Sequence, residues 1–469
     1  MWSVALLVTA LEGWMTELLV KGDHQRAVEA LRRSYEAIPE GAPVRLAKRT
    51  SNLFRWRDPS DAPGLDVSGF DRVLSVDPGS RTAEVQGMTT YEDLVDATLP
   101  HGLMPTVVPQ LKTITLGGAV TGLGIESTSF RLGLPHEAVL EMEVLTGDGR
   151  IVTATPDNEH RDLFFGFPNS YGTLGYSLRL KIELIPVKPY VRLRHLRFGD
   201  AAELSRVIAK ITEDEAYDGE HVDFMDGTVF SANEQYLTLG TFTDTAPYTS
   251  DYTGQRIYYR SIQERSVDFL TVRDYIWRWD TDWFWCSGAF GVQNPVVRRL
   301  WPDKAKRSDV YRKLVAYDRR FHIMARVDRW RGQRPREDVI QDIEVPVERL
   351  PDFLEFFHEK VGMSPIWLCP LRARDRWPLY PLEPGRTYVN VGFWGTVRLP
   401  PGQIPEYHNR LIERKVAALD AHKSLYSTSF YSRDEFWRHY DGETYQRLKK
   451  AYDPGKRLLD LYDKCVRGR

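Results

Sequence analysis

The segment from residue 109 to residue 152 constrains this chain more than any other, because four glycines fall between residues 117 and 124. Glycine lets the backbone approach a ligand closely and present N–H donors to anionic oxygen. A second pair, Gly172 and Gly175, immediately precedes a strand-like run. Glycines also mark bulges and turns. Two such elements in one chain nevertheless predict a site for the pyrophosphate of a cofactor.

The nearest alternative is a Rossmann fingerprint, since Gly122 and Gly124 supply its first half. The third glycine is missing, because Ser127 stands in its place. Gly133 and Pro135 also interrupt the helix that should follow. The pattern therefore disfavours a Rossmann site.

Composition limits the classes of protein that the chain can belong to. A length of 469 residues predicts two or three domains, and the net charge of -2 offers no basic field for nucleic acid. Hydrophobic residues at 42% and charged residues at 27% are typical of a soluble globular protein. The three cysteines have neither disulfide nor metal-ligand spacing. We expect no metal, no nucleic-acid partner and a cytoplasmic location.

The first twenty residues are apolar but are interrupted by Glu12 and Glu17. The longest uncharged run is too short to span a bilayer, and no basic residue precedes it as in a signal peptide. We expect an amphipathic helix, which is either a packing extension or a contact with a membrane surface.

Short β runs joined by tight turns dominate the chain up to about residue 190. We predict helices over 25–38 and 91–99, hairpins from 72–77 with 82–87 and from 138–145 with 150–154, and a strand over 177–185. This pattern is typical of an α+β fold with hairpins and not of repeated βαβ units.

The composition changes near residue 190, after which Trp, Tyr, Phe and Arg become dense, above all between 275 and 291. A helical pattern covers residues 406–425. We therefore predict a first domain over 1–190, in which 1–24 is an extension, a second domain over 191–425, and a C-terminal segment, 426–469, that returns to the first domain.

Several motifs together resemble a known family. They are the turn at 43–52, the glycine stretch, the hairpin at 147–149 and the YGTLG motif at 171–175. Their order resembles the FAD-binding (PCMH-type) domain of the vanillyl-alcohol oxidase superfamily. The runs GIESTS (124–129), PIWLCP (365–370) and DEFWRHYDGETYQRL (434–448) resemble its sterol Δ24-reductase branch, and within that branch most closely the bacterial flavoprotein subunits that make 10-methylstearic (tuberculostearic) acid.

This resemblance implies a two-domain α+β fold, with an α/β substrate cap, that binds FAD. The positions that match the family's cofactor contacts are Lys48, Arg49, Thr50, Ser51, Asn52, Gly117, Gly118, Gly122, Gly124, Glu126, Ser127, Gly172 and Thr173. Many oxidases of the superfamily link the flavin to a His in the first of these loops. No His lies between residues 45 and 57 here, so FAD is expected to bind without a covalent link.

The resemblance also implies reduction of a C=C bond with NADPH as the electron donor. Such chemistry needs a hydride from reduced flavin and a proton from an acid. The candidate catalytic residues are Glu126, Tyr431 and Tyr445, although Phe430 beside Tyr431 shows that the family's tyrosine pattern is shifted by one place. Glu126 would need a pKa raised by burial, and it could instead only accept a hydrogen bond from the flavin or the backbone.

The aromatic residues after residue 190 suit a long apolar substrate, whose binding depends on buried apolar area. The candidates for contact with substrate are Trp283, Trp285 and Trp367, with Arg372 for a phospholipid head group. Packing between elements of the cap, and a solvated arginine face, are the alternatives.

We therefore expect a reductase that converts a 10-methylene fatty acyl chain of a phospholipid, made by a separate SAM-dependent methyltransferase, into a 10-methyl chain. Peripheral attachment to the membrane is left open. The alternatives are a sterol Δ24-reductase, which the arginine-rich, bacterial composition disfavours, an oxidase of a sugar or an alcohol, and a flavin-binding lipid carrier without turnover.

Overall fold

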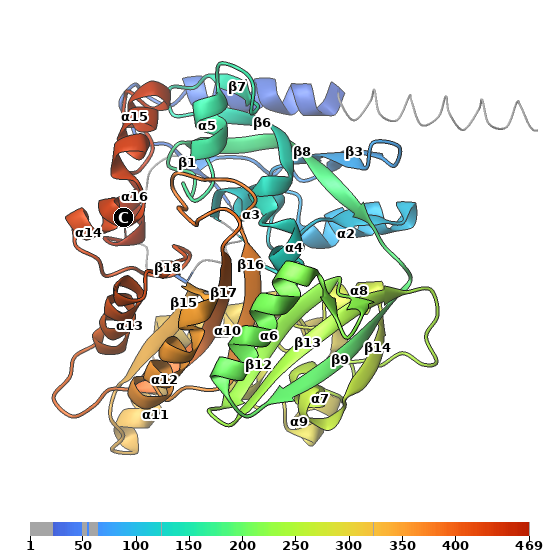
Figure 1. The fold of residues 1–469 in the computed structure, drawn as a ribbon. Coiled ribbons are helices and arrows are strands. Elements are labelled where there is room, and N and C mark those ends of the chain that lie inside the picture. Colours follow the sequence, from blue (N-terminus) through green and yellow to red (C-terminus); the bar gives the residue numbers. More distant parts are fainter. Residues whose placement is uncertain (1–21, 49–53, 56–63, 123, 322, 469) are drawn as a thin grey trace, which may run out of the picture.

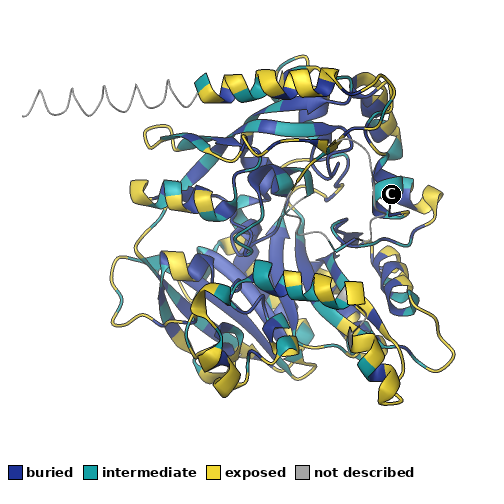
Figure 2. Ribbon diagram, turned by 180° about the vertical axis from the view of Figure 1, so that it is seen from behind, coloured by how far each residue is buried: buried dark blue, intermediate teal, exposed yellow. Residues whose placement is uncertain are grey.

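The chain forms two α+β units, each built on its own antiparallel sheet, in the computed structural model (Figure 1). The structure describes residues 22–48, 54–55, 64–122, 124–321 and 323–468. The predicted two-domain α+β fold is confirmed. Figure 2 shows the buried strands of both sheets lying inside a shell of partly exposed helices.

The first sheet has the order β3-β4-β8-β6-β7, with β5 beside β8. Its strands are β3 (Val73–Asp77), β4 (Thr82–Gln86), β5 (Leu103–Pro105), β6 (Val139–Thr146), β7 (Ile151–Ala154) and β8 (Gly175–Pro186). Both predicted hairpins and the predicted strand are observed, because β3 pairs with β4 and β6 pairs with both β7 and β8. A separate parallel pair joins β1 (Arg45–Leu46) to β2 (Gly64–Leu65).

Helices cover this sheet and connect its strands. They are α2 (Tyr91–Thr98), α3 (Leu116–Gly122), α4 (Ser129–Leu132) and α5 (Arg161–Gly166). Residues 22–36 are also helical, in agreement with the predicted helix over 25–38. The predicted N-terminal helix over the first twenty residues lies outside the described residues.

The second sheet has the order β14-β9-β13-β12-β16-β17-β15-β18. Its strands are β9 (Tyr190–Phe198), β12 (Phe224–Ser231), β13 (Glu234–Thr243), β14 (Val267–Thr271), β15 (Arg336–Pro346), β16 (Ile366–Arg372), β17 (Thr387–Arg398) and β18 (His422–Lys423). The short pair β10 (Ala216–Tyr217) and β11 (Glu220–His221) lies apart from it. The chain passes from the first sheet to the second between Pro186 and Tyr190.

The two faces of the second sheet differ, since successive side chains of a strand point to opposite sides. One face is apolar, as with Ile343 and Val391, and packs against α6 (Ala201–Asp214) and α12 (Leu350–Lys360). The other face carries polar and aromatic side chains toward the segment 275–291. The remaining helices of this unit are α7 (Tyr258–Glu264), α8 (Val272–Ile276), α9 (Pro295–Leu300), α10 (Ser308–Phe321), α11 (Ile323–Trp330) and α13 (Tyr407–Ala418).

The helix predicted over 406–425 is shorter than expected. It ends at Ala418, because Asp420 adopts a left-handed backbone with φ of 53° and His422 and Lys423 then pair with β15 as β18. Pairing with the open edge of a sheet thus overrides the helical pattern.

The C-terminal helices lie against the first unit. They are α14 (Arg433–His439), α15 (Gly442–Tyr452) and α16 (Leu461–Cys465). The Lys449 Nζ donates to the Thr173 carbonyl at 2.7 Å. A Cβ on Gly166 would come within 2.1 Å of Leu448, so α15 and α5 pack closely.

Within the described part of the chain, we find no helix that is both long and apolar enough to cross a membrane.

Candidate active site

The structure brings together the described parts of the three segments that were predicted to hold FAD. Lys48 donates its Nζ to Thr115 Oγ1 at 3.1 Å, just before α3. Tyr171, from the YGTLG motif, donates its hydroxyl to the Gly122 carbonyl at 2.7 Å. Lys48 and Tyr171 therefore lie at the beginning and the end of α3. The predicted residues Arg49, Thr50, Ser51 and Asn52 lie outside the described residues.

The predicted glycines are packed tightly against protein atoms. A Cβ on Gly117 would lie 2.5 Å from Ser177 Oγ, and one on Gly122 would lie 3.0 Å from the Tyr171 ring. Gly118 would meet Thr115 Oγ1 at 2.8 Å, and Gly124 would meet a proline ring at 3.0 Å. Because these glycines have no side chains, α3 can pack closely against the sheet and against the YGTLG motif. This packing role was not predicted from the sequence.

Arg55 provides the test of whether these segments suit FAD. Its side chain is buried over the Tyr171 ring, 4.5 Å from the ring centroid, and Nη1 contacts Cys465 Sγ. Nε and Nη2 find no partner among the described residues. Thr113 Oγ1, just before α3, and Ser170 Oγ, beside Tyr171, are also buried without a described partner. Buried unpaired donors are costly, and a pyrophosphate would satisfy them. The residues present therefore fit FAD.

A buried charged cluster joins the end of the glycine stretch to the second sheet. Arg278 Nη2 lies 3.2 Å from Glu126 Oε1 and 2.9 Å from Asp226 Oδ2. The Ser127 N–H donates to Glu126 Oε1 at 2.8 Å, and Trp279 Nε1 donates to Asp226 at 3.0 Å. Burial raises the pKa of Glu126, against the lowering effect of the Arg278 charge. We call this group the arginine cluster.

Glu126 keeps one oxygen, Oε2, buried without a hydrogen-bond partner among the described residues. Ser127 Oγ lies 2.9 Å from the Tyr275 hydroxyl, and its carbonyl accepts the Met225 N–H at 2.7 Å. The two predicted residues of this stretch thus connect the first unit to the second.

A second acid, Asp342, lies on strand β15, on the same face of the second sheet as Asp226. Asp342 Oδ1 accepts from Asn390 Nδ2 at 3.1 Å, and Tyr426 also interacts with this carboxyl group. Its cross-strand neighbour is Gly392, where a Cβ would come within 2.5 Å of Asp342 Oδ1. Burial raises the pKa of Asp342 to about 7. We call Asp342, Asn390 and Tyr426 the neutral acid site.

Glu344, two residues along the same strand, is fully buried and accepts from Ser424 Oγ at 2.8 Å. Burial raises its pKa well above the usual range of a glutamate. Asp342 differs from it in that the side chain keeps part of its surface accessible. Of the two acids, Asp342 is therefore the one that another molecule can reach.

Aromatic rings surround the neutral acid site and meet the first unit. Trp394 Nε1 donates to the Tyr426 hydroxyl at 2.8 Å, and Trp394 stacks on Phe284 with centroids 4.3 Å apart. Phe54, which follows the first predicted FAD loop, stacks on Trp283 at 5.7 Å and donates its N–H to the Tyr426 carbonyl at 2.9 Å. We call these five residues, with Trp285, the interdomain aromatic cluster.

Backbone strain marks the same place. Trp283 and Phe284 adopt left-handed backbones, with φ of 45° and 60°, which cost roughly 1–3 kcal/mol each for bulky residues. Strained bulky residues persist where the surrounding structure holds them for a function. Phe54, Trp285, Trp394, Tyr426 and Asp342 are all partly accessible, and Tyr426 connects Phe54, Trp394 and Asp342.

The predicted substrate residues separate into two groups. Trp283 and Trp285 belong to the interdomain aromatic cluster, and Trp367 lies against it, 5.4 Å from Phe284, while also donating to Asp226 at 3.2 Å. Arg372 ends the strand that begins with Ile366, about 17 Å along the strand from Trp367. The structure therefore does not bring Arg372 together with the tryptophans.

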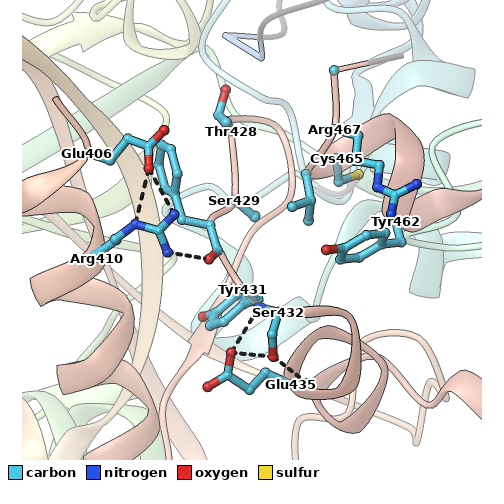
Figure 3. Close-up of a pocket in the computed structure, with 13 residues that line it drawn as sticks. Glu406, Arg410, Thr428, Ser429, Tyr431, Ser432, Glu435, Tyr462, Cys465 and Arg467 are labelled. Carbon is cyan, nitrogen blue, oxygen red and sulfur yellow. Dashed lines mark hydrogen bonds and ion pairs between the residues drawn. The ribbon is translucent and has the colours of Figure 1, made fainter.

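Neither candidate catalytic tyrosine has a described contact with Glu126 or Asp342, whereas Tyr445 interacts with Thr173, one of the predicted cofactor residues. Tyr445 is fully buried, stacks on Trp437 and accepts the Leu461 N–H on its hydroxyl at 2.9 Å. Tyr431 borders a different pocket, of 720 Å³, between α13 and the C-terminal helices (Figure 3). In that pocket Arg410 pairs with Glu406 at 2.8 Å. We place neither tyrosine beside the glycine stretch.

Sequence reasoning missed the residues that complete the site, namely Asp226, Arg278, Asp342, Asn390 and Tyr426. One signal was available for Asp342, because the run QDIEVP (341–346) places two acids at alternate positions of a strand whose other side carries Ile343 and Val345. Acids on the buried face of a strand indicate a functional or structural role, since burial of an unpaired charge is costly. The partners of Asp342 carry no comparable local signal.

Comparisons with known proteins agree with the fold and with the first unit. Residues 22–155 match a family model described as FAD binding domain. The chain is 27% identical to Delta(24)-sterol reductase of Homo sapiens over 426 residues, which cover 84% of this chain and 76% of that protein. It is 28% identical to Delta(24)-sterol reductase homolog dhcr-24 of Caenorhabditis elegans, covering 85% and 78% of the two chains. Cytokinin dehydrogenase 7 of Oryza sativa subsp. japonica is 36% identical over 26% of this chain and 23% of its own.

These similarities support FAD as the cofactor and an oxidoreductase as the class of protein. Among the predicted functions they favour the alternative, a sterol Δ24-reductase, over the reduction of a 10-methylene acyl chain. The chain therefore carries an FAD-binding domain within a two-domain α+β fold, and most of its length is homologous to the Delta(24)-sterol reductases.

Proposed function

We propose that this protein is an FAD-dependent reductase that saturates a C=C bond of an apolar lipid. The observation that carries the proposal is the neutral acid site. An acid whose pKa burial raises to about 7 lies among aromatic side chains, and its partner Tyr426 contacts Phe54, which follows the first predicted FAD loop. Apolar walls with one acid suit an alkene, which offers almost no polar group for recognition.

Saturation of an alkene adds a hydride to one carbon and a proton to the other. Bound FAD, once reduced, supplies the hydride, and we propose NADPH as the source of its electrons. Asp342 supplies the proton: its O–H bond breaks as the new C–H bond forms. The carboxylate that remains keeps the hydrogen bond from Asn390 and the interaction with Tyr426, and both lower its pKa. Water then returns a proton to Asp342.

Glu126, Tyr431 and Tyr445 are weaker candidates for the acid. Glu126 is committed to the Arg278 guanidinium and to the Ser127 N–H, both of which favour its charged form. The Tyr445 hydroxyl already accepts a backbone N–H. We therefore propose that Glu126 positions Arg278 and joins the two units beside the FAD segments.

For the substrate, the named relatives favour the side-chain alkene of a Δ24 sterol. A second candidate is the 10-methylene acyl chain of a phospholipid, which a SAM-dependent methyltransferase would supply. The specific observation in its favour is the exposed apolar and basic surface described in the next subsection. With that substrate we propose a cytoplasmic protein that attaches peripherally to the membrane.

The test is an anaerobic measurement of flavin absorbance. The FAD-loaded protein is reduced with NADPH and is then mixed separately with a Δ24 sterol and with a phospholipid that bears a 10-methylene acyl chain. We expect the oxidised flavin band to return with one of them, together with the saturated product by mass spectrometry. Reoxidation by oxygen alone, after reduction by a polyol, would instead establish an oxidase.

A further inference from the structure

Exposed apolar side chains are frequent along one stretch of the second unit's chain, from α9 (Pro295–Leu300) through α11 (Ile323–Trp330). Of the twelve large apolar residues that are exposed in the described chain, seven lie between residues 296 and 330. They include Leu300, Tyr317, Phe321, Met324 and Trp330, of which Trp330 is 86% exposed. Isolated exposed apolar residues are ordinary, whereas a concentration of them indicates a binding surface.

The helix α10 is apolar on two sides. Tyr311, Leu314 and Val315 face inward and pack against the core. Tyr317 and Phe321, one turn apart on the outside, are 58% and 40% exposed, and their ring centroids lie 4.5 Å apart. A surface helix normally presents polar residues on its outer side. The outer side of α10 therefore has the composition of a contact.

The same region is strongly basic. Residues 295–335 contain 13 Arg and Lys but only 4 Asp and Glu, in a protein whose net charge is -2. Lys313, Arg320, Arg326, Arg329 and Arg331 are exposed around the apolar side chains. Three of the four acids are in ion pairs: Asp303 with Lys306 at 2.7 Å, Asp309 with Arg307 at 3.0 Å and Asp328 with Arg336 at 2.7 Å.

We propose that the outer side of α10, together with α11, docks the protein on the surface of an anionic phospholipid bilayer. Aromatic and aliphatic side chains between cations are the composition of segments that lie in a membrane interface. The guanidinium groups would pair with lipid phosphates, while Phe321, Met324 and Trp330 enter the acyl boundary.

This surface adjoins the candidate site. The Tyr311 ring of α10 stacks on Phe290, with centroids 5.8 Å apart and planes within 6°. Phe290 ends the short helix η3 (Cys286–Phe290), which directly follows Trp285 of the interdomain aromatic cluster. In Figure 1, α11 lies at the margin of the second unit away from the first unit. Delivery of a lipid from the membrane to the site rests on the proposed function, whereas docking itself does not.

The experiment is cosedimentation of the FAD-loaded full chain with vesicles. One set contains phosphatidylcholine with about one-third phosphatidylglycerol, and the other contains phosphatidylcholine alone. We expect binding at least about tenfold tighter to the anionic vesicles at low salt, and weaker binding at about 0.5 M NaCl, where the Debye length is only a few ångströms.

Two double variants test the residues. Phe321→Ser with Trp330→Ser, and Arg326→Glu with Arg329→Glu, should each weaken binding by about tenfold or more. The controls are Leu459→Ser, at an apolar position that is 40% exposed elsewhere, and Lys210→Glu, whose side chain is 77% exposed on α6. Both controls should bind as the wild type does.

Three results would overturn the proposal: no binding of the wild type to anionic vesicles, equal binding by the variants, or binding that is indifferent to lipid charge and salt. Self-association that the Phe321→Ser, Trp330→Ser variant abolishes, without vesicle binding, would assign the surface to a second copy of the chain. Turnover of an alkene dispersed in detergent is measured in parallel. If the wild type does not turn over the alkene, the proposed function is refuted, whereas the conclusion from vesicle binding is unaffected.

Discussion

Two acid sites lie on the same face of the second sheet, and they differ in the partners that the fold gives them. In the arginine cluster, two carboxyl groups share the Arg278 guanidinium. In the neutral acid site, Asp342 has only an amide and a phenol. A buried acid beside a cation is stabilised in its charged form, whereas one beside neutral groups tends to keep its proton. A carboxyl group in the arginine cluster is therefore suited to a structural role, whereas the carboxyl group of Asp342 is suited to proton transfer.

The largest effect should follow from removing the shared cation. Arg278→Leu leaves Glu126 and Asp226 buried without a counter-charge, which should lower the free energy of unfolding by about 3–5 kcal/mol. Chemical denaturation, followed by tryptophan fluorescence, measures the loss. A stability close to that of the wild type would show that the two carboxyl groups take up protons and do not need Arg278.

The second prediction compares the two sites in catalysis. Asp342→Asn removes the proposed proton donor and should slow reoxidation of the reduced flavin by the alkene about 100-fold, while reduction by NADPH is unchanged. The matched variant is Glu126→Gln, which we expect to retain FAD and to slow the alkene step less than Asp342→Asn does. Rapid mixing with absorbance detection measures the two half-reactions separately.

A reversed order of the two variants would return the role of acid to Glu126. Full activity of Asp342→Asn would remove the neutral acid site from the chemistry altogether.

The third prediction concerns pH. A carboxyl group whose pKa is raised to about 7 in the folded state binds a proton that the unfolded chain has lost by pH 6. Stability should therefore fall as pH rises through 7, by about 1.4 kcal/mol between pH 6 and pH 8. In Asp342→Asn this decrease should be absent. Unfolding curves at the two pH values measure it.

Asn390 and Tyr426 interact with the Asp342 carboxyl group directly. Glu344 interacts with it through space, and a charge on Asp342 raises the pKa of Glu344 further. Glu344→Gln is therefore the control, because a loss of the pH dependence in that variant would assign it to Glu344 and not to Asp342.

The smallest effect should come from Tyr426→Phe. This change removes the acceptor of the Trp394 Nε1 hydrogen bond and should cost about 1 kcal/mol of stability. Because Tyr426 lowers the pKa of Asp342, its loss should move the pH profile of the alkene step to higher pH. An unchanged profile would show that the phenol does not influence the acid.

The features that could be predicted from the sequence are those set by residues close together along the chain. The glycine stretch, the hairpins and the YGTLG motif were recognisable because each is a local pattern. Trp283 and Trp285 were recognisable for the same reason, since they are concentrated in one short run. The prediction that a helix continues to residue 425 was wrong, because His422 and Lys423 pair with β15, a strand that is distant in the sequence.

The amino-acid sequence by itself determined the two α+β units, the glycine-rich segments predicted to bind FAD and the aromatic richness of the second unit, because these follow from local patterns along the chain. Only the tertiary structure decided which acid meets which partner. Asp342, Asn390 and Tyr426 come from three separate segments, and the antiparallel register of β15 with β17 sets Asp342 opposite Gly392. Protonation of a buried acid depends on neighbours brought in by such long-range pairing, and no local pattern in the sequence records them.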